Sequence, residues 1–186
     1  MPDLIDAGKN LFLIGYRCTG KSTVAEILAE KLGRSWTDAD AILEARQGRT
    51  IAEIFAEEGE TGFRDREAVL LEELCGRRQH IVATGGGVVL QAANRERLRA
   101  SGFCIWLTAD AHTIAERIEA DPMTRLRRPN LRCGGLAEVE ELLKIREPFY
   151  RDCAHWTIDT VKRTPSQVAE NILERLDGYP CRNVGL

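Results

Sequence analysis

The chain of 186 residues lacks the features that mark a secreted, membrane-spanning or zinc-binding protein. Its six cysteines form no C-x-x-C pair and its three histidines are scattered, so we expect reduced thiols and no zinc site. No apolar run approaches the roughly 20 residues that span a bilayer, and the N-terminus lacks the basic and apolar regions of a signal peptide. The net charge of −3 gives no general attraction to nucleic acid. These absences predict a cytoplasmic protein with no nucleic-acid or membrane partner. We also expect a monomer.

Short apolar stretches alternate with longer helical patterns, which is typical of parallel βαβ units. The length suits one core, and there is no internal repeat or linker, so we expect a single α/β domain over residues 1–186. The predicted strands, which would form one five-stranded sheet, are 10–14, 35–37, 80–83, 103–107 and 156–158. The predicted helices are 21–32, 62–75, 111–119, 136–151 and 165–176.

Three further segments stand apart from this alternation. Two short helical pieces, near 42–45 and 51–56, would form an insert at about 38–75, with Thr50 and Glu53 as a capping box. Residues 121–135 carry four arginines among prolines and glycines and show no apolar period, which predicts a positively charged lid. A nucleic-acid patch is the weaker interpretation, because aromatic residues are not interleaved with these arginines. Residues 178–186 are expected to be a loose tail.

The most informative motif is Gly-Tyr-Arg-Cys-Thr-Gly-Lys-Ser-Thr at residues 15–23, between a predicted strand and a predicted helix. The pattern G-x-x-x-x-G-K-[ST] is typical of a P-loop, whose backbone N–H groups and helix N-terminus surround the phosphates of a nucleotide. Lys21 would reach the β- and γ-phosphates, and the Ser22 hydroxyl would bind Mg²⁺. A chance glycine turn is the alternative, but the flanking strand and helix oppose it. The expected nucleotide-binding residues here are Gly15, Cys18, Thr19, Gly20, Lys21, Ser22 and Thr23.

Two carboxylates, Asp38 and Asp40, follow the second predicted strand, at the edge where parallel sheets deliver functional side chains. One acid can face the Mg²⁺–phosphate side while the other faces an acceptor hydroxyl. The alternative is that one of them simply caps the next helix.

Three more patterns favour a functional interpretation because they occur together with a P-loop. Arg64 and Glu67 are i,i+3 neighbours on a predicted helix, either a clamp for a carboxylate or a solvated ion pair. Three consecutive glycines, 85–87, would let the backbone approach a small ligand closely, although a flexible connector is the alternative. Pro148 suggests a kink that could aim Arg146 inward, and a surface arginine is the other interpretation.

Taken in order, the P-loop, D-x-D, F-R-x-x-E, G-G-G, R-P-x-L and R-x-P-x-Y motifs resemble those of the shikimate kinase family across nearly the whole chain. The resemblance implies a three-layer P-loop kinase fold with a five-stranded parallel sheet, a substrate-binding insert and a mobile lid. It implies ATP-dependent phosphorylation of the 3-hydroxyl of shikimate, giving shikimate 3-phosphate and ADP, with ATP and Mg²⁺ required.

The resemblance also implies roles for single residues. Lys21 would hold phosphates, Ser22 and Asp38 would hold Mg²⁺, and Asp40 would accept from the reacting hydroxyl. The substrate carboxylate and ring would lie against Arg64, Glu67, Gly85, Gly86, Gly87 and Arg146, with Glu67 orienting Arg64. Arg128 would be the lid arginine that reaches the transferring phosphoryl group. Arg117 resembles a residue that stacks on adenine, and Arg163 to Pro165 resembles the adenine loop.

One position departs from the family pattern: Cys18 stands where a glycine is usual. A side chain there would impose strain on the order of 1 kcal/mol if the position needs a positive φ. Among phosphate-binding N–H groups its thiol would be reactive, unless it packs as a small buried apolar group. Two other functions stay open: a kinase for another hydroxy acid such as quinate or gluconate, and a sensor that binds nucleotide or shikimate without turnover.

Overall fold

The computed structural model describes residues 8–121 and 134–177 of the chain. Most of the predicted lid, including Arg128, and all of the predicted tail lie outside these residues.

One parallel sheet of five strands organises the described residues, as the sequence predicts. The strands are β1 (Asn10–Ile14), β2 (Trp36–Asp38), β3 (Ile81–Ala83), β4 (Gly102–Thr108) and β5 (Trp156–Asp159). Their order across the sheet is β2-β3-β1-β4-β5, so the chain crosses over between neighbouring strands. The carboxyl ends of all five strands therefore meet at one edge, where the P-loop begins.

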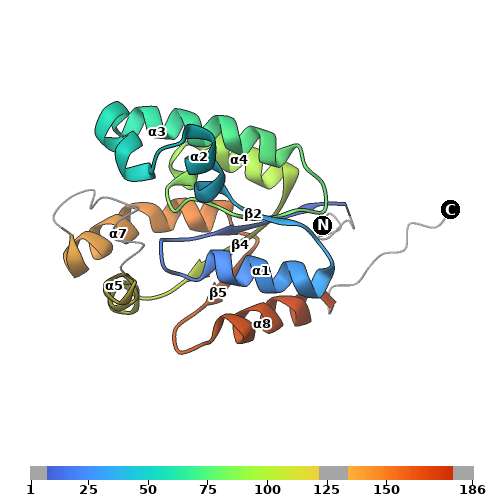
Figure 1. Cartoon of the computed structure of the whole chain (residues 1–186). Coiled ribbons are helices and arrows are strands. Elements are labelled where there is room, and N and C mark those ends of the chain that lie inside the picture. Colours follow the sequence, from blue (N-terminus) through green and yellow to red (C-terminus); the bar gives the residue numbers. More distant parts are fainter. Residues whose placement is uncertain (1–7, 122–133, 178–186) are drawn as a thin grey trace.

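Helices cover both faces of the sheet and give three layers (Figure 1). Helices α1 (Lys21–Leu32) and α8 (Pro165–Asp177) lie on one face. On the other face lie α3 (Ile51–Cys75), α4 (Ala92–Ser101) and α7 (Gly135–Cys153), while α5 (Ala111–Ala120) packs against α7. Helix α4 and the 3₁₀ turn η1 (Val88–Leu90) were not among the predicted elements.

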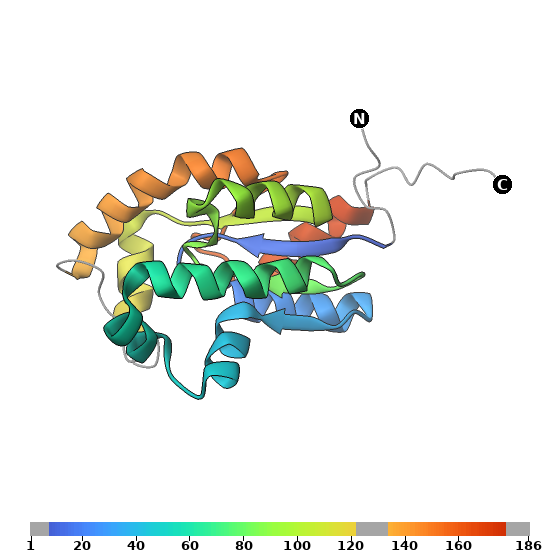
Figure 2. The ribbon, with the colours of Figure 1, turned by 90° about the horizontal axis from the view of Figure 1, so that it is seen from above.

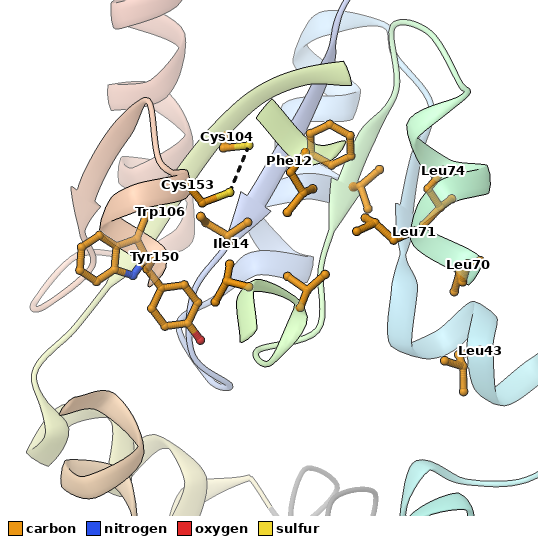
Figure 3. Close-up of a cluster of buried hydrophobic side chains, with 14 of the residues drawn as sticks. Phe12, Ile14, Leu43, Leu70, Leu71, Leu74, Cys104, Trp106, Tyr150 and Cys153 are labelled. Atoms are coloured by element: carbon orange, nitrogen blue, oxygen red, sulfur yellow. Dashed lines mark hydrogen bonds between the residues drawn. The ribbon is translucent and has the colours of Figure 1, made fainter. Parts of the chain in front are cut away.

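Alternating side chains of the central strand supply both halves of the core. In β1, Leu11 and Leu13 join the cluster under α1 and α8, whereas Phe12 and Ile14 face α3 and α7. The second cluster includes the stacked rings of Trp106 and Tyr150 and the thiols of Cys104 and Cys153 (Figure 3). The four described cysteines are free, which agrees with the prediction of reduced thiols.

The predicted insert corresponds to α2 (Ala39–Gln47) and α3, which lie beside the carboxyl end of β2 (Figure 2). Thr50 and Glu53 form the predicted capping box at the start of α3. The predicted piece near 42–45 lies in α2, whereas the piece near 51–56 and the predicted helix 62–75 form one span, α3, which is broken at Gly59 by a non-helical φ of 70°. This bend places the second half of α3, with Arg64 and Glu67, over the glycines that follow β3.

Candidate active site

The P-loop connects the buried end of β1 to the first turn of α1. Gly15 has a φ of 139°, and a Cβ there would lie 2.3 Å from the Leu107 carbonyl oxygen, so only glycine fits. The Thr19 hydroxyl donates to the Tyr16 carbonyl at 2.9 Å and closes the loop. Lys21 is buried, and its ammonium donates to the carbonyl oxygens of Gly15 and Tyr16 at 2.9 and 2.6 Å. The Lys21 ammonium is therefore held against the backbone of the P-loop.

Cys18 occupies the left-handed region with a φ of 61°, so the position does need a positive φ. An L-residue in this region carries a strain of about 1–2 kcal/mol. The Cys18 side chain is half-buried and lines the cavity above the P-loop, which does not fit a small apolar group sealed in the core.

Asp38, the last residue of β2, caps the next helix and also contacts the P-loop helix. Its Oδ1 accepts from the Ala41 backbone N–H at 3.0 Å and caps α2, while its Oδ2 accepts a short hydrogen bond from the Ser22 hydroxyl. The Ser22 hydroxyl of α1 and the Asp38 carboxylate of β2 therefore lie in contact, and each has an oxygen that could coordinate a metal ion.

The three glycines after β3 lie against the two carboxylates and the guanidinium of the predicted substrate site. A Cβ added to Gly85 would lie 2.4 Å from Glu67 Oε1 and 3.0 Å from Asp40 Oδ1. A Cβ on Gly87 would lie 2.2 Å from a guanidinium nitrogen of Arg64. The absence of side chains at these glycines is what lets α2 and α3 bring Asp40, Arg64 and Glu67 to one place.

Arg64 and Glu67 form a buried ion pair, with 2.6 Å between NH1 and Oε2. The exposed Glu60 holds the same guanidinium at 3.1 Å. Burial raises the pKa of the Glu67 carboxyl, and the charge of Arg64 opposes that effect. The other oxygen of Glu67, Oε1, is buried with no hydrogen-bond partner among the described residues. A ligand with a hydroxyl or other donor would satisfy this oxygen.

Arg146 points inward from α7, whose helix continues through Pro148. The arginine is buried, and its guanidinium donates weakly to the Gly86 carbonyl at 3.4 Å. The Tyr150 hydroxyl, one turn later, also donates to that carbonyl. Arg146 is therefore a second buried cation beside the glycines, and the surface interpretation is wrong.

Of the predicted adenine-binding residues, Arg117 contacts the P-loop. Arg117 on α5 donates to the Cys18 carbonyl at 3.3 Å and to the Thr160 carbonyl at 2.8 Å, and so ties the P-loop to the segment after β5. Arg163 is exposed on that segment, and Pro165 begins α8. Arg128 lies outside the described residues.

A cavity of about 330 Å³ opens above the P-loop and reaches Asp38 and Asp40. Among the predicted residues, it is lined by Cys18, Gly20, Lys21, Ser22, Thr23, Asp38 and Asp40. It is also lined by Arg17, Ile51, Thr84 and Asp121, for which the sequence analysis predicted no role. The P-loop pattern leaves the position of Arg17 free, so the motif itself carried no signal for that residue.

A P-loop at the carboxyl edge of a parallel sheet, with Asp40 in its cavity and two buried arginines beside the glycines after β3, is the arrangement expected of a P-loop kinase that acts on a small molecule. The sequence profile of shikimate kinase matches residues 17–177. A shikimate kinase from Rhodopirellula baltica is 42% identical over 167 residues, covering 89% of this chain and 89% of that protein. One from Symbiobacterium thermophilum is 42% identical over 168 residues, covering 90% and 95%.

A solved structure is equally similar: shikimate kinase from Acinetobacter baumannii in complex with shikimate superposes with a TM-score of 0.85. It is 40% identical and covers 90% of this chain and 92% of that one. The chain belongs to the shikimate kinase family.

Proposed function

We propose that the protein transfers the γ-phosphoryl group of ATP to the 3-hydroxyl of shikimate, giving shikimate 3-phosphate and ADP. The observation that carries this proposal is the convergence of Asp40, Arg64 and Glu67 on the glycines 85–87, beside an intact P-loop. The family and the relative that binds shikimate support the choice of acceptor.

In this proposal the phosphates of ATP bind to the P-loop N–H groups, and Lys21 turns from the loop carbonyls to the β- and γ-phosphates. Its present hydrogen-bond partners include two neutral carbonyls, which a phosphate can replace with a stronger, charge-assisted hydrogen bond. Arg128 from the lid would add a further cation. Adenine would lie between Arg117 and the loop at Arg163 and Pro165.

Magnesium fits the pair of oxygens on Ser22 and Asp38. Within 8–121 and 134–177, no three His, Cys, Asp or Glu side chains form a metal cluster, so phosphate and water would supply the remaining ligands. Bound there, the ion would neutralise charge on the transferring phosphoryl group.

Shikimate would bind through its carboxylate to Arg64 and Arg146, the two buried guanidiniums beside Gly86 and Gly87. Glu67 keeps Arg64 in place, and its unpaired Oε1 is available for a substrate hydroxyl. Asp40 would accept the proton of the reacting hydroxyl. A loose transition state lets that proton leave late, so the acceptor need not be a strong base.

We also propose that residues 1–186 form one kinase domain that acts as a cytoplasmic monomer without nucleic-acid or membrane partners. No described helix is long and apolar enough to cross a membrane. The free thiols and the net charge of −3 support the rest. Over the described part of the chain, the exposed large apolar side chains are Val69, Leu136 and Ile145, which are too few for an obligate interface.

A coupled ADP-release assay tests the function. We expect ADP production that depends on both shikimate and Mg²⁺, with much lower rates on quinate and gluconate, and no turnover in Lys21→Ala. A preference for quinate or gluconate would identify the other kind of hydroxy-acid kinase. Binding of nucleotide and shikimate without ADP release would identify a sensor.

A further inference from the structure

A buried ion pair joins the P-loop to the start of α7. The Arg17 guanidinium donates from NH2 to Oε1 of Glu138 at 3.2 Å, across 121 residues of sequence. The Arg17 side chain is 12% exposed and that of Glu138 is 0% exposed. The second oxygen of Glu138 accepts the Gly134 backbone N–H at 2.9 Å. One carboxylate therefore fixes both the P-loop and the residue that precedes α7.

Attachment of α7 alone does not account for this pair. Removing two charges from water is costly, and apolar residues of similar size often give equal or greater stability. The other end of α7 is held by Asp152, which pairs with Arg95 and Arg99 at the surface, where it is 47% exposed. An exposed ion pair of this kind attaches a helix to its neighbour at a small desolvation cost. Attachment of α7 therefore does not explain why Glu138 is buried.

That reason lies on the other side of Arg17. The arginine lines the cavity together with Lys21, Ser22 and Asp40, where the phosphates would lie. Its guanidinium lies 5.9 Å from the centre of the Tyr16 ring, and that of Arg146 lies 5.5 Å from the same ring. The Nε of Arg17 is buried and has no hydrogen-bond partner among the described residues. Arg17 is thus held by Glu138 at the cavity wall and retains donor capacity.

We propose that Glu138 is a positioning residue that acts through Arg17. The carboxylate holds the guanidinium at the wall of the phosphate cavity, where its positive charge stabilises the phosphoryl group during transfer. Without the carboxylate the guanidinium can rotate, and a cation that must reorganise contributes less to transition-state stabilisation. The inference rests on the proposed kinase activity, and Glu138 itself contacts no substrate.

Steady-state kinetics of Glu138→Gln, Arg17→Met and the double variant test this proposal. We expect Glu138→Gln to lower kcat about tenfold or more, with the KM for shikimate within about twofold of wild type. Arg17→Met should lower kcat at least as much. The double variant should be no slower than Arg17→Met, because Glu138 has no effect once its partner is gone. Asp152→Asn, which breaks the exposed pair on the same helix, is the matched control and should keep kcat.

The proposal would be overturned if the fold-decrease of kcat in the double variant equalled the product of the decreases in the single variants. Wild-type kcat in either single variant would overturn it as well. An equal loss of kcat in Asp152→Asn would also overturn it, since attachment of α7 would then be the cause.

Thermal unfolding is measured first; if Glu138→Gln does not fold, the comparison moves to Arg17→Met and Arg17→Lys. Lysine keeps the positive charge but lacks the planar guanidinium group with its several N–H donors. The kcat of Arg17→Lys should therefore lie above that of Arg17→Met, and an equal kcat in the two variants would contradict the proposal. An inactive wild-type protein would refute the kinase assignment itself.

Discussion

Gly87→Ala should displace Arg64, a proposed ligand of the substrate carboxylate, and leave the P-loop in place. Gly87 has a φ of −104°, so alanine can adopt its backbone conformation. The new Cβ would lie 2.2, 2.3 and 2.4 Å from NH2, NH1 and Cζ of Arg64. Contacts between such atoms are favourable at roughly 3.5–4.0 Å, so the guanidinium must move by about 1 Å or more. The variant therefore displaces Arg64 while leaving its charge in the protein.

The size of the effect follows from the bonds that Arg64 would make. A hydrogen bond to a charged group contributes about 1.5–3 kcal/mol, and each 1.4 kcal/mol is a factor of about ten. The KM for shikimate should therefore rise about ten- to a hundredfold, with the KM for ATP little changed. Because the buried pair with Glu67 is also weakened, we expect a lower Tm.

Gly86→Ala is the matched control, in the same turn. Its Cβ would lie 3.3 Å from the backbone nitrogen of Arg17 and 3.4 Å from the carbonyl oxygen of Gly15. The new methyl group therefore contacts the P-loop and not Arg64. It should raise the KM for ATP more than that for shikimate, the reverse of Gly87→Ala. Coupled assays that vary each substrate separate the two. If Gly87→Ala left the KM for shikimate unchanged, Arg64 would not be a substrate ligand and the proposed substrate site would be wrong.

Further predictions concern Asp40, Arg64 and Cys18. Asp40→Asn should lower kcat at least about a hundredfold with a smaller effect on ATP binding, while Arg64→Ala should mainly raise the KM for shikimate. Wild-type kinetics in both would place the substrate elsewhere. Cys18→Gly should relieve about 1 kcal/mol of backbone strain, raise Tm by about 2–4 °C and keep or improve activity; a lower Tm would contradict the strain. Alkylation of Cys18, followed by mass spectrometry, should be slowed by Mg·ATP, and a rate insensitive to nucleotide would place its sulfur away from the phosphates.

Features that depend on backbone chemistry at fixed spacing were predictable from the sequence. The P-loop, the capping box at Thr50 and the glycines 85–87 each require particular residue types at particular positions, and the structure has the P-loop and the capping box where the sequence predicts them. The parallel sheet followed from buried apolar runs such as β4. The role of the glycines became concrete only in three dimensions, because their partners come from α2 and α3.

Helix α4 shows why one element escaped prediction. Of its ten residues only Asn94 and Leu98 are buried, so the sequence has no apolar period to read. Contacts far along the chain hold it in place: Arg95 and Arg99 pair with Asp152.

Glu138 shows the same limit within the site. In sequence it is one of several acids between apolar positions, and a buried carboxylate cannot be told from a solvated one until its partner is known. That partner, Arg17, lies 121 residues away.

Phosphorylation of shikimate at its 3-hydroxyl is tested most directly by incubating the protein with ATP, Mg²⁺ and shikimate and recording ³¹P and ¹H NMR spectra of the product. We expect one new phosphate ester coupled to the proton at C3, formed in step with ADP and absent with Lys21→Ala. A phosphate ester at another hydroxyl, or ADP release with unmodified shikimate, would contradict it.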